Sequence, residues 1–345
     1  MFRLLRFALA PFLPAVLLLV ACFFGTPWAI AGILAITAMV FVLDRLPVSA
    51  TKATGDGHTL SVVLGLMHFV LLGCALWAMN GTLDTIAKVL IVFGCGLYFG
   101  QVSNSNAHEL IHRANRWAFR LGAANYASLL FGHHTSAHRL VHHVYVATPK
   151  DPATAKGGVG FWAYLPRTWV GSFRAGLRAE RQRHSGVRWP TPYVGYVIGA
   201  FISLGCGYLL GGGPGIAGLL AIAFHAQLQL MLSDYVQHYG LERRLLPNGR
   251  YEPTNSAHSW NAPHWYSSAM MLNAPRHSAH HEHPARAFPQ LELDKDTMPM
   301  LPHSLPVMAT VALFPPLWRR VMDSRVGYWR RRSAETHGDM MPASL

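Results

Sequence analysis

The stretch from Gly132 to Pro152 reads GHHTSAHRLVHHVYVATPKDP and contains five histidines. His138 and His142 are four residues apart, so a helix would place them on one face, with His143 one step round. The same helix end would then serve two neighbouring metal ions. Neutral imidazole is a good ligand for iron, copper, nickel and zinc, and a buried polar group needs a partner. We therefore interpret this stretch as half of a metal site.

The rest of the chain is unusually apolar. It has 345 residues, of which 51% are hydrophobic and only 13% are charged. Soluble domains carry about 25% charged residues. This deficit, together with several long apolar runs, predicts an all-α integral membrane protein. No linker divides the sequence, so we expect a single membrane domain over residues 1–345.

Apolar runs predict about six membrane spans. The spans cover residues 8–24, 28–43, 60–79, 85–102, 192–210 and 216–232. The first run resembles a signal peptide but lacks a convincing cleavage site, so a retained helix is expected. Residues 313–326 have aromatic and basic faces and predict an interfacial helix. Residues 330–345 are expected to form a flexible tail.

The charge pattern predicts the orientation. Lys and Arg number 29 against 16 Asp and Glu, a net charge of +13. The turns at residues 80–84 and 211–215 carry no Lys or Arg, whereas residues 113–188 and those after Glu242 carry many. The positive-inside rule then places both termini and all histidine groups on the cytoplasmic side of the inner (plasma) membrane. We expect the basic residues to contact anionic lipid headgroups at the membrane surface. No motif indicates nucleic-acid binding.

Three other histidine groups complete the predicted metal site. One follows the fourth span, one follows the sixth, and one lies in Arg276–Pro284. The nine candidate metal ligands are His108, His112, His138, His142, His143, His238, His277, His280 and His281. A tetrahedral metal takes about four ligands, so nine imidazoles imply two metals.

Further residues are assigned to supporting roles. Glu109, Asp151 and Asp234 are candidates for bonding the free N–H of a ligand histidine, although Asp151 also fits a turn before Pro152. The other notable histidines are either structural or able to orient ligands or loops. These are His133 and His134, His68 and His225 within spans, and His258, His264 and His283.

Two other interpretations stay open. His108-Glu109-Leu-Ile-His112 matches the HExxH pattern of zinc proteases, in which Glu109 would be the general base. A non-catalytic metal transporter would also place histidines near spans. The protease predicts a single zinc, and the transporter predicts no use of O₂.

Nitrogen ligands without a nearby thiolate favour iron, which exchanges electrons with O₂ where zinc and magnesium do not. Two ferrous ions with O₂ as co-substrate would oxidise an unactivated C–H bond. Apolar spans beneath the metals predict a slot for a lipophilic substrate that enters from the bilayer. Hydroxylation then requires two electrons from a donor that docks at the basic cytoplasmic face.

The motifs resemble a known family over roughly residues 106–326. The segments that carry the resemblance are His108–His112, His138–Trp162, His238-Tyr239-Gly240 and Arg276–His281. They resemble the signatures of the membrane alkane 1-monooxygenases (alkane hydroxylases), which are related to the membrane fatty-acid desaturases. The His-Tyr-Gly step is the most specific, because it separates this family from the desaturases and carotenoid hydroxylases.

The resemblance implies a di-iron oxidoreductase. It assigns the nine histidines as ligands of two non-haem irons, n-alkanes as the substrate, and rubredoxin with its NADH-linked reductase as the electron donor. The sequence departs from the family at Ala137, Asp234, Gln237 and Ala279, and no ligand is lost. Fatty acyl, alkyl-aromatic and carotenoid substrates, and desaturation in place of hydroxylation, therefore remain alternatives.

Overall fold

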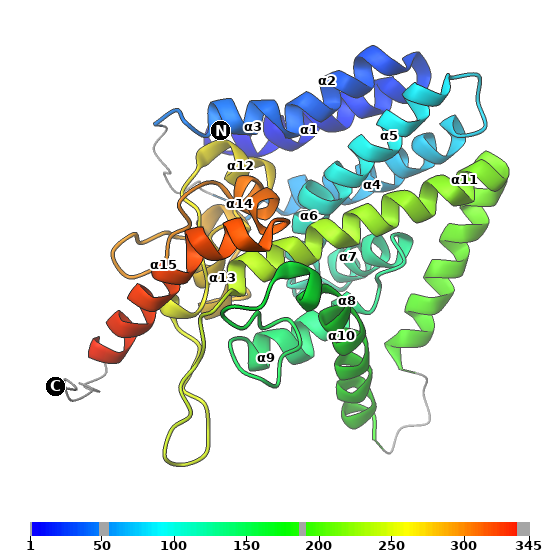
Figure 1. The fold of residues 1–345 in the computed structure, drawn as a ribbon. Helices are drawn as coiled ribbons and strands as arrows, with labels where there is room; N and C mark the ends of the chain where they lie inside the picture. Colours follow the sequence, from blue (N-terminus) through cyan, green and yellow to red (C-terminus); the bar gives the residue numbers. More distant parts are fainter. Residues whose placement is uncertain (1, 48–54, 186–190, 337–345) are drawn as a thin grey trace.

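The computed structural model describes residues 2–47, 55–185 and 191–336. Its elements in these ranges are helical, apart from two isolated β-bridges. Long helices lie side by side, and shorter helices gather at one end of them (Figure 1). The long array consists of α1 (Phe2–Phe24), α2 (Thr26–Ile36), α3 (Ala38–Leu43), α4 (His58–Ala78), α5 (Thr85–Tyr98), α6 (Asn104–Ile111) and α11 (Pro192–His238).

Five helical stretches are long and apolar enough to cross a membrane. They are Leu5–Phe24, Thr26–Leu43, His58–Ala78, Thr85–Ile111 and Pro192–His238. The first four correspond to the first four predicted spans. Large apolar side chains such as Leu9, Phe201 and Leu209 are exposed on these helices, as expected of surfaces that face lipid.

The fifth and sixth predicted spans lie in α11 (Pro192–His238), one on each side of a kink that separates two helices. Helix α11 has 47 residues and bends sharply at Gly212, where φ is 60° and ψ is −149° (Figure 1). Only glycine adopts this backbone conformation readily. The predicted Gly-rich turn is therefore in the expected place, and the helix has a first arm before Gly212 and a second arm after it.

The fourth predicted span ends too early at residue 102. After α5 the chain continues through a π-helix, η1 (Phe99–Ser103), directly into α6. The sequence from Asn104 is polar, so apolarity alone does not predict that the helix continues. Helix α6 is nevertheless buried against α7 (Arg116–Ser128). The continuous stretch therefore delivers His108 at the end of a membrane helix.

The remaining helices form the cap on the long array. Helix α7 packs against α4, α6 and α11. The others are α8 (His134–Ala137), η2 (His138–His142), α9 (His143–Tyr145), α10 (Phe161–Arg183), η3 (Ser256–His258), α12 (Trp265–Met270), α13 (His277–Glu282), η4 (Phe288–Gln290), α14 (Leu305–Ala312) and α15 (Pro315–Thr336).

Helix α15 extends beyond the predicted interfacial helix. Trp318, Met322 and Val326, at intervals of four, form its buried face. The prediction of a flexible tail from residue 330 is wrong for residues 330–336, which are helical. Arg330 explains this, because its Nε donates to the Gly240 carbonyl at 2.7 Å. Residues 337–345 of the predicted tail lie outside the described residues.

Candidate metal centre

Nine histidines meet at the capped end of the long helices, and they are the nine that the sequence predicts. They form two groups, and within each group one ring nitrogen per residue lies within 4.8 Å of the others. The first group contains His108, His112, His138, His143 and His280; the second contains His142, His238, His277 and His281.

The two groups share structural elements. Helix α13 and the segment from His138 to His143 each supply histidines to both groups. The ring centroid of His143, in the first group, lies 4.7 Å from that of His281, in the second. Two metal ions bound in these groups would therefore be close neighbours.

The π-helix η2 explains how three histidines within six residues divide between the groups. A π-helix joins residues i and i+5 by hydrogen bonds. Accordingly, the Nε2 atoms of His138 and His143, five residues apart, lie 2.9 Å from each other. His142 turns toward the second group instead. The expectation that His138 and His142 share one metal-binding face is therefore wrong. His138 shares its group with His143, the next residue, instead.

The spacing of the ring nitrogens fits a shared cation. Nε2 of His280 lies 3.1 Å from that of His143, and Nε2 of His277 lies 2.9 Å from His238 and 3.1 Å from His281. Adjacent nitrogens on one ion lie about 3 Å apart and opposite ones about 4.2 Å, for metal–nitrogen bonds of about 2.1 Å. A neutral imidazole has a single N–H, so hydrogen bonds alone do not account for three converging nitrogens.

Seven further ring nitrogens of these groups are buried and have no hydrogen-bond partner in the described part of the chain. Three are the Nε2 atoms of His108, His112 and His142, and four are the Nδ1 atoms of His138, His143, His238 and His281. An unsatisfied buried polar atom costs about 1–3 kcal/mol. A cation bound to the three Nε2 lone pairs would remove this cost for those atoms. Both the spacing and the unpaired atoms therefore fit metal binding by these residues.

Burial keeps most of these imidazoles neutral. It lowers the pKa of His138, His143 and His280 well below the usual value, and neighbouring histidines lower it further. The neutral ring is the form that binds a metal. His142 differs: burial acts to lower its pKa, but the Asp151 carboxylate outweighs burial and the net shift is upward.

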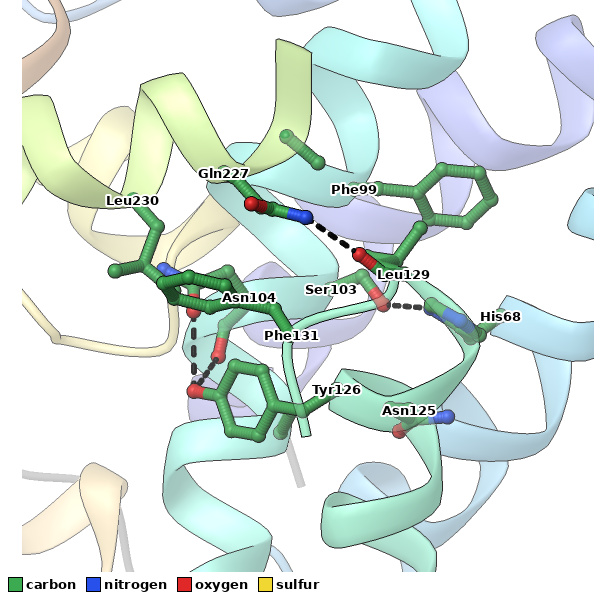
Figure 2. A pocket seen from close by; sticks show the side chains of 12 residues that line it. His68, Phe99, Ser103, Asn104, Asn125, Tyr126, Leu129, Phe131, Gln227 and Leu230 are labelled. Atoms are coloured by element: carbon green, nitrogen blue, oxygen red, sulfur yellow. Dashed lines mark hydrogen bonds between the residues drawn. The ribbon is translucent and has the colours of Figure 1, made fainter. Parts of the chain in front are cut away.

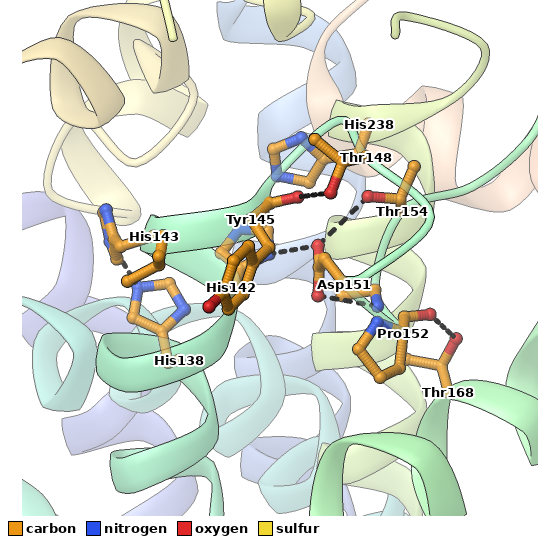
Figure 3. Close-up of polar contacts among 12 residues, drawn as sticks. His138, His142, His143, Tyr145, Thr148, Asp151, Pro152, Thr154, Thr168 and His238 are labelled. Atoms are coloured by element: carbon orange, nitrogen blue, oxygen red, sulfur yellow. Dashed lines mark hydrogen bonds and ion pairs between the residues drawn. The ribbon is translucent and has the colours of Figure 1, made fainter. Parts of the chain in front are cut away.

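Asp151 orients His142, as one of the predicted supporting carboxylates. Its Oδ2 lies 2.9 Å from Nδ1 of His142 (Figure 3), which leaves Nε2 for the second group. Its Oδ1 accepts from the backbone N–H of Ala153 at 3.0 Å, so the predicted turn also forms. Carboxylates in this position fix the tautomer and orientation of a ligand histidine.

We predict that Asp151→Asn weakens metal binding in the second group by about 10- to 100-fold. Asparagine preserves the shape but removes the negative charge that supports the Nδ1–H of His142. Asp234→Asn is the matched control. Asp234 borders the same small pocket, but forms no hydrogen bond with a histidine in the described chain. Iron retained during dialysis against a graded chelator measures the difference, and equal retention in the two variants would contradict this role.

Glu109 does not bond a ligand histidine. Its Oε1 lies 2.7 Å from Nη2 of Arg113 and accepts from the backbone N–H of Phe288 at 3.4 Å. The general base of a zinc protease must instead face the metal-bound water. The ion pair with Arg113 therefore disfavours the protease interpretation.

Trp260 holds the end of α11 on both sides of His238. Its backbone N–H donates to the carbonyl of Gln237, and its Nε1–H to the carbonyl of Tyr239, both at 2.8 Å. The last carbonyls of a helix have no partner within the helix, and the fully buried Trp260 supplies one. Sequence reasoning missed this residue, because nothing in the spacing relates residue 260 to residue 238.

Asn261 holds helix α13 in the same way. Its Oδ1 accepts from the backbone N–H of Ser278 at 3.0 Å, and its Nδ2 donates to Ser278 Oγ at 2.8 Å. Ser278 follows His277 directly. The first turn of the helix that carries three site histidines is therefore fixed by a buried side chain from the loop between η3 and α12.

The remaining predicted histidines lie outside the two groups. The ring nitrogens of His68 lie 2.5 Å from Ser103 Oγ and 2.7 Å from Ser128 Oγ. The ring of His134 lies 5.2 Å from that of His138. His258 bonds Glu252 at 3.1 Å and so supports the loop before it. Also outside the groups are His133, His225, His264 and His283.

A small pocket adjoins the first group on the side of the long helices. Ala107, the residue before His108, lines it together with apolar side chains such as Phe99 and Leu230 (Figure 2). Its volume is about 10 Å³, about enough for one water molecule. The Tyr126 hydroxyl donates to Asn104 Oδ1 at 3.0 Å along one wall.

Comparisons with known proteins agree with this geometry. The sequence model of the fatty acid desaturase family matches residues 84–311. Alkane 1-monooxygenase 2 of Pseudomonas aeruginosa is 32% identical over 268 residues, which are 74% of this chain and 71% of the relative. Alkane 1-monooxygenase 1 of the same organism is 31% identical over 323 residues, which are 87% and 83% of the two chains.

A third relative is alkane 1-monooxygenase 1 of Alcanivorax borkumensis, which is 33% identical over 77% of this chain and 65% of its own length. The matched region contains all nine histidines of the two groups. The chain belongs to the membrane alkane 1-monooxygenase family, within the wider relationship of the fatty acid desaturases, and is an oxidoreductase.

Proposed function

We propose that the protein hydroxylates the terminal carbon of an apolar substrate, most simply an n-alkane to a 1-alkanol, with O₂ and two irons. The observation that carries the proposal is the pair of adjacent, buried, all-histidine groups at the end of apolar helices. The first group would hold one iron through five histidines and the second would hold the other through four. Bound iron would supply the one-electron steps that O₂ activation requires.

The protein's own residues would orient the substrate and exclude water. The pocket beside Ala107, the residue before His108, has a mostly apolar surface. An alkyl chain would enter it as side chains such as Leu129 and Leu230 move apart. Its end would then lie beside His108, while the buried helices keep water from the reacting carbon.

Electrons would come from a separate acidic carrier, for which rubredoxin with its NADH-linked reductase is the family's precedent. Helix α15 exposes Arg319, Arg320 and Arg325 at the capped end of the molecule. Such a basic face attracts an acidic partner by long-range electrostatics. We place this face, both termini and the metal centre on the cytoplasmic side of the inner membrane, as the charge pattern predicts.

The test is product formation by the purified protein in membranes, with rubredoxin, reductase, NADH and O₂. We expect primary alcohols from alkanes of several lengths, and two irons per chain by metal analysis. Fatty acyl substrates and an alkylbenzene should be assayed in parallel, because they are the alternatives within the same chemistry. An alkene or ring alcohol would assign the protein to a desaturase-like or carotenoid-type activity. A single zinc and no O₂-dependent product would refute the proposal.

A further inference from the structure

A cavity of about 350 Å³ with charged side chains in its lining, here called the polar cavity, lies between helix α10, the π-helix η2 and the start of helix α11. Its charged lining groups are Arg139, Arg183 and Glu180, and His184 lies beside them. Arg139 directly follows His138 in η2. The cavity therefore adjoins the element that carries two of the proposed metal ligands.

Glu180, the acidic group among the described residues of this lining, is already engaged within the protein. Ser136 Oγ donates to Glu180 Oε1 at 2.6 Å, and His184 Nδ1 lies 3.4 Å from Glu180 Oε2. The guanidinium groups of Arg139 and Arg183 are exposed. Arg139 rests 5.0 Å from the ring centroid of Phe119, an arrangement that leaves its in-plane N–H groups accessible. Two positive charges against one negative charge favour an anionic ligand.

The same face of the first arm of α11 borders a second, apolar cavity. Tyr196 lines the polar cavity, and Gly199, Ser203 and Cys206 line a cavity of about 390 Å³ further along the arm. Steps of three and four residues keep these positions on one face of a helix. The other walls of the apolar cavity come from α4 and α7. An ionic site at one end of a membrane helix, followed by apolar space along it, matches the shape of an amphiphile.

Neither cavity includes a histidine of the two metal groups in its lining. The charged lining of the polar cavity selects an ionic group that an n-alkane lacks, so the occupant is distinct from the proposed substrate. The volume of the polar cavity also exceeds what a lone carboxylate requires. The occupant that fits is a lipid with a larger anionic headgroup.

We propose that the two cavities hold one anionic phospholipid, with its phosphate between Arg139 and Arg183 and an acyl chain in the apolar cavity. Guanidinium groups bind phosphate oxygens with paired N–H bonds. Anionic lipids are abundant in the cytoplasmic leaflet, where the charge pattern places this end of α11. The bound lipid joins the first arm of α11 to η2 and so supports the segment from His138 to His143.

The experiment is lipid binding by the detergent-purified full chain, measured by native mass spectrometry with phosphatidylglycerol, phosphatidylcholine and oleate as probes. We expect one tightly held phosphatidylglycerol per chain, and several-fold weaker phosphatidylcholine binding. The double variant Arg139→Ala/Arg183→Ala should lose most of this preference. The double variant Arg178→Ala/Arg181→Ala is the matched control, since both arginines are exposed on α10 but line neither cavity.

Equal phosphatidylglycerol binding by the two double variants would overturn the proposal. Tighter binding of oleate would overturn the phospholipid assignment and indicate a carboxylate site. A lining variant that does not fold is replaced by the charge-preserving pair Arg139→Lys/Arg183→Lys, which should retain the preference for anionic lipid but bind less tightly. Lipid binding requires neither iron nor O₂, so this inference and the proposed hydroxylase function can fail independently.

Discussion

Replacing His238 with alanine is expected to reduce bound iron from two per chain to one and to abolish alcohol formation. His238 is fully buried at the end of α11 and is one of only four nitrogens in the second group. Its Nε2 lies 2.9 Å from that of His277. No other side chain replaces a nitrogen held this rigidly, because Trp260 fixes the backbone on both sides. The three remaining imidazoles would enclose an incomplete site.

The matched control is His225→Ala, which makes the same substitution on the same helix. His225 lies outside both metal groups and stacks on Phe93, with ring centroids 5.1 Å apart. We expect this variant to retain both irons. Iron per chain is measured by elemental analysis, and alcohol by gas chromatography. A His238→Ala protein that keeps two irons and full activity would remove His238 from the proposed ligand set.

That these nine histidines come together could be predicted from sequence, because imidazoles are conspicuous in an apolar chain. Histidines at intervals of three, four and five residues, placed just after membrane spans, have few structural uses. Their division between two groups could not be predicted. It depends on the π-helical winding of residues 138–142, which changes which residues share a face, and no residue type encodes that winding.

Polar parts of the fold were harder to predict than apolar parts. Helix α10 was missed because its exposed face is rich in arginine and its apolar positions are few. The continuation of the fourth span through Asn104 was missed for the same reason, since burial by α7 replaces apolarity as the stabilising feature. Trp260 and Asn261 contact backbone atoms that are far from them in the sequence. The spacing of residues along the chain does not predict such contacts.

The hairpin in α11 leads to a second large effect: we expect Gly215→Val to destabilise the protein severely. A Cβ atom at Gly215 would lie 2.2 Å from the carbonyl oxygen of Gly207 in the opposite arm. Backbone atoms cannot rotate away as a flexible side chain can, so the arms must separate. Membrane helices approach this closely only where small residues meet. Overpacking usually costs about 1–3 kcal/mol. Because the valine side chain is branched and meets a backbone carbonyl, we expect the loss of stability to lie at or above the upper end of this range.

The matched control is Gly213→Val, two residues away in the same turn, where an added Cβ meets no atom within 4 Å. The thermal unfolding midpoint in detergent should fall markedly for Gly215→Val and stay near the native value for Gly213→Val. Iron content should fall with the midpoint, because the second arm carries His238 at its far end and a displaced arm moves that ligand. Equal midpoints for the two variants would mean that the arms do not pack through Gly207 and Gly215. In that case the hairpin would not be what positions the second group.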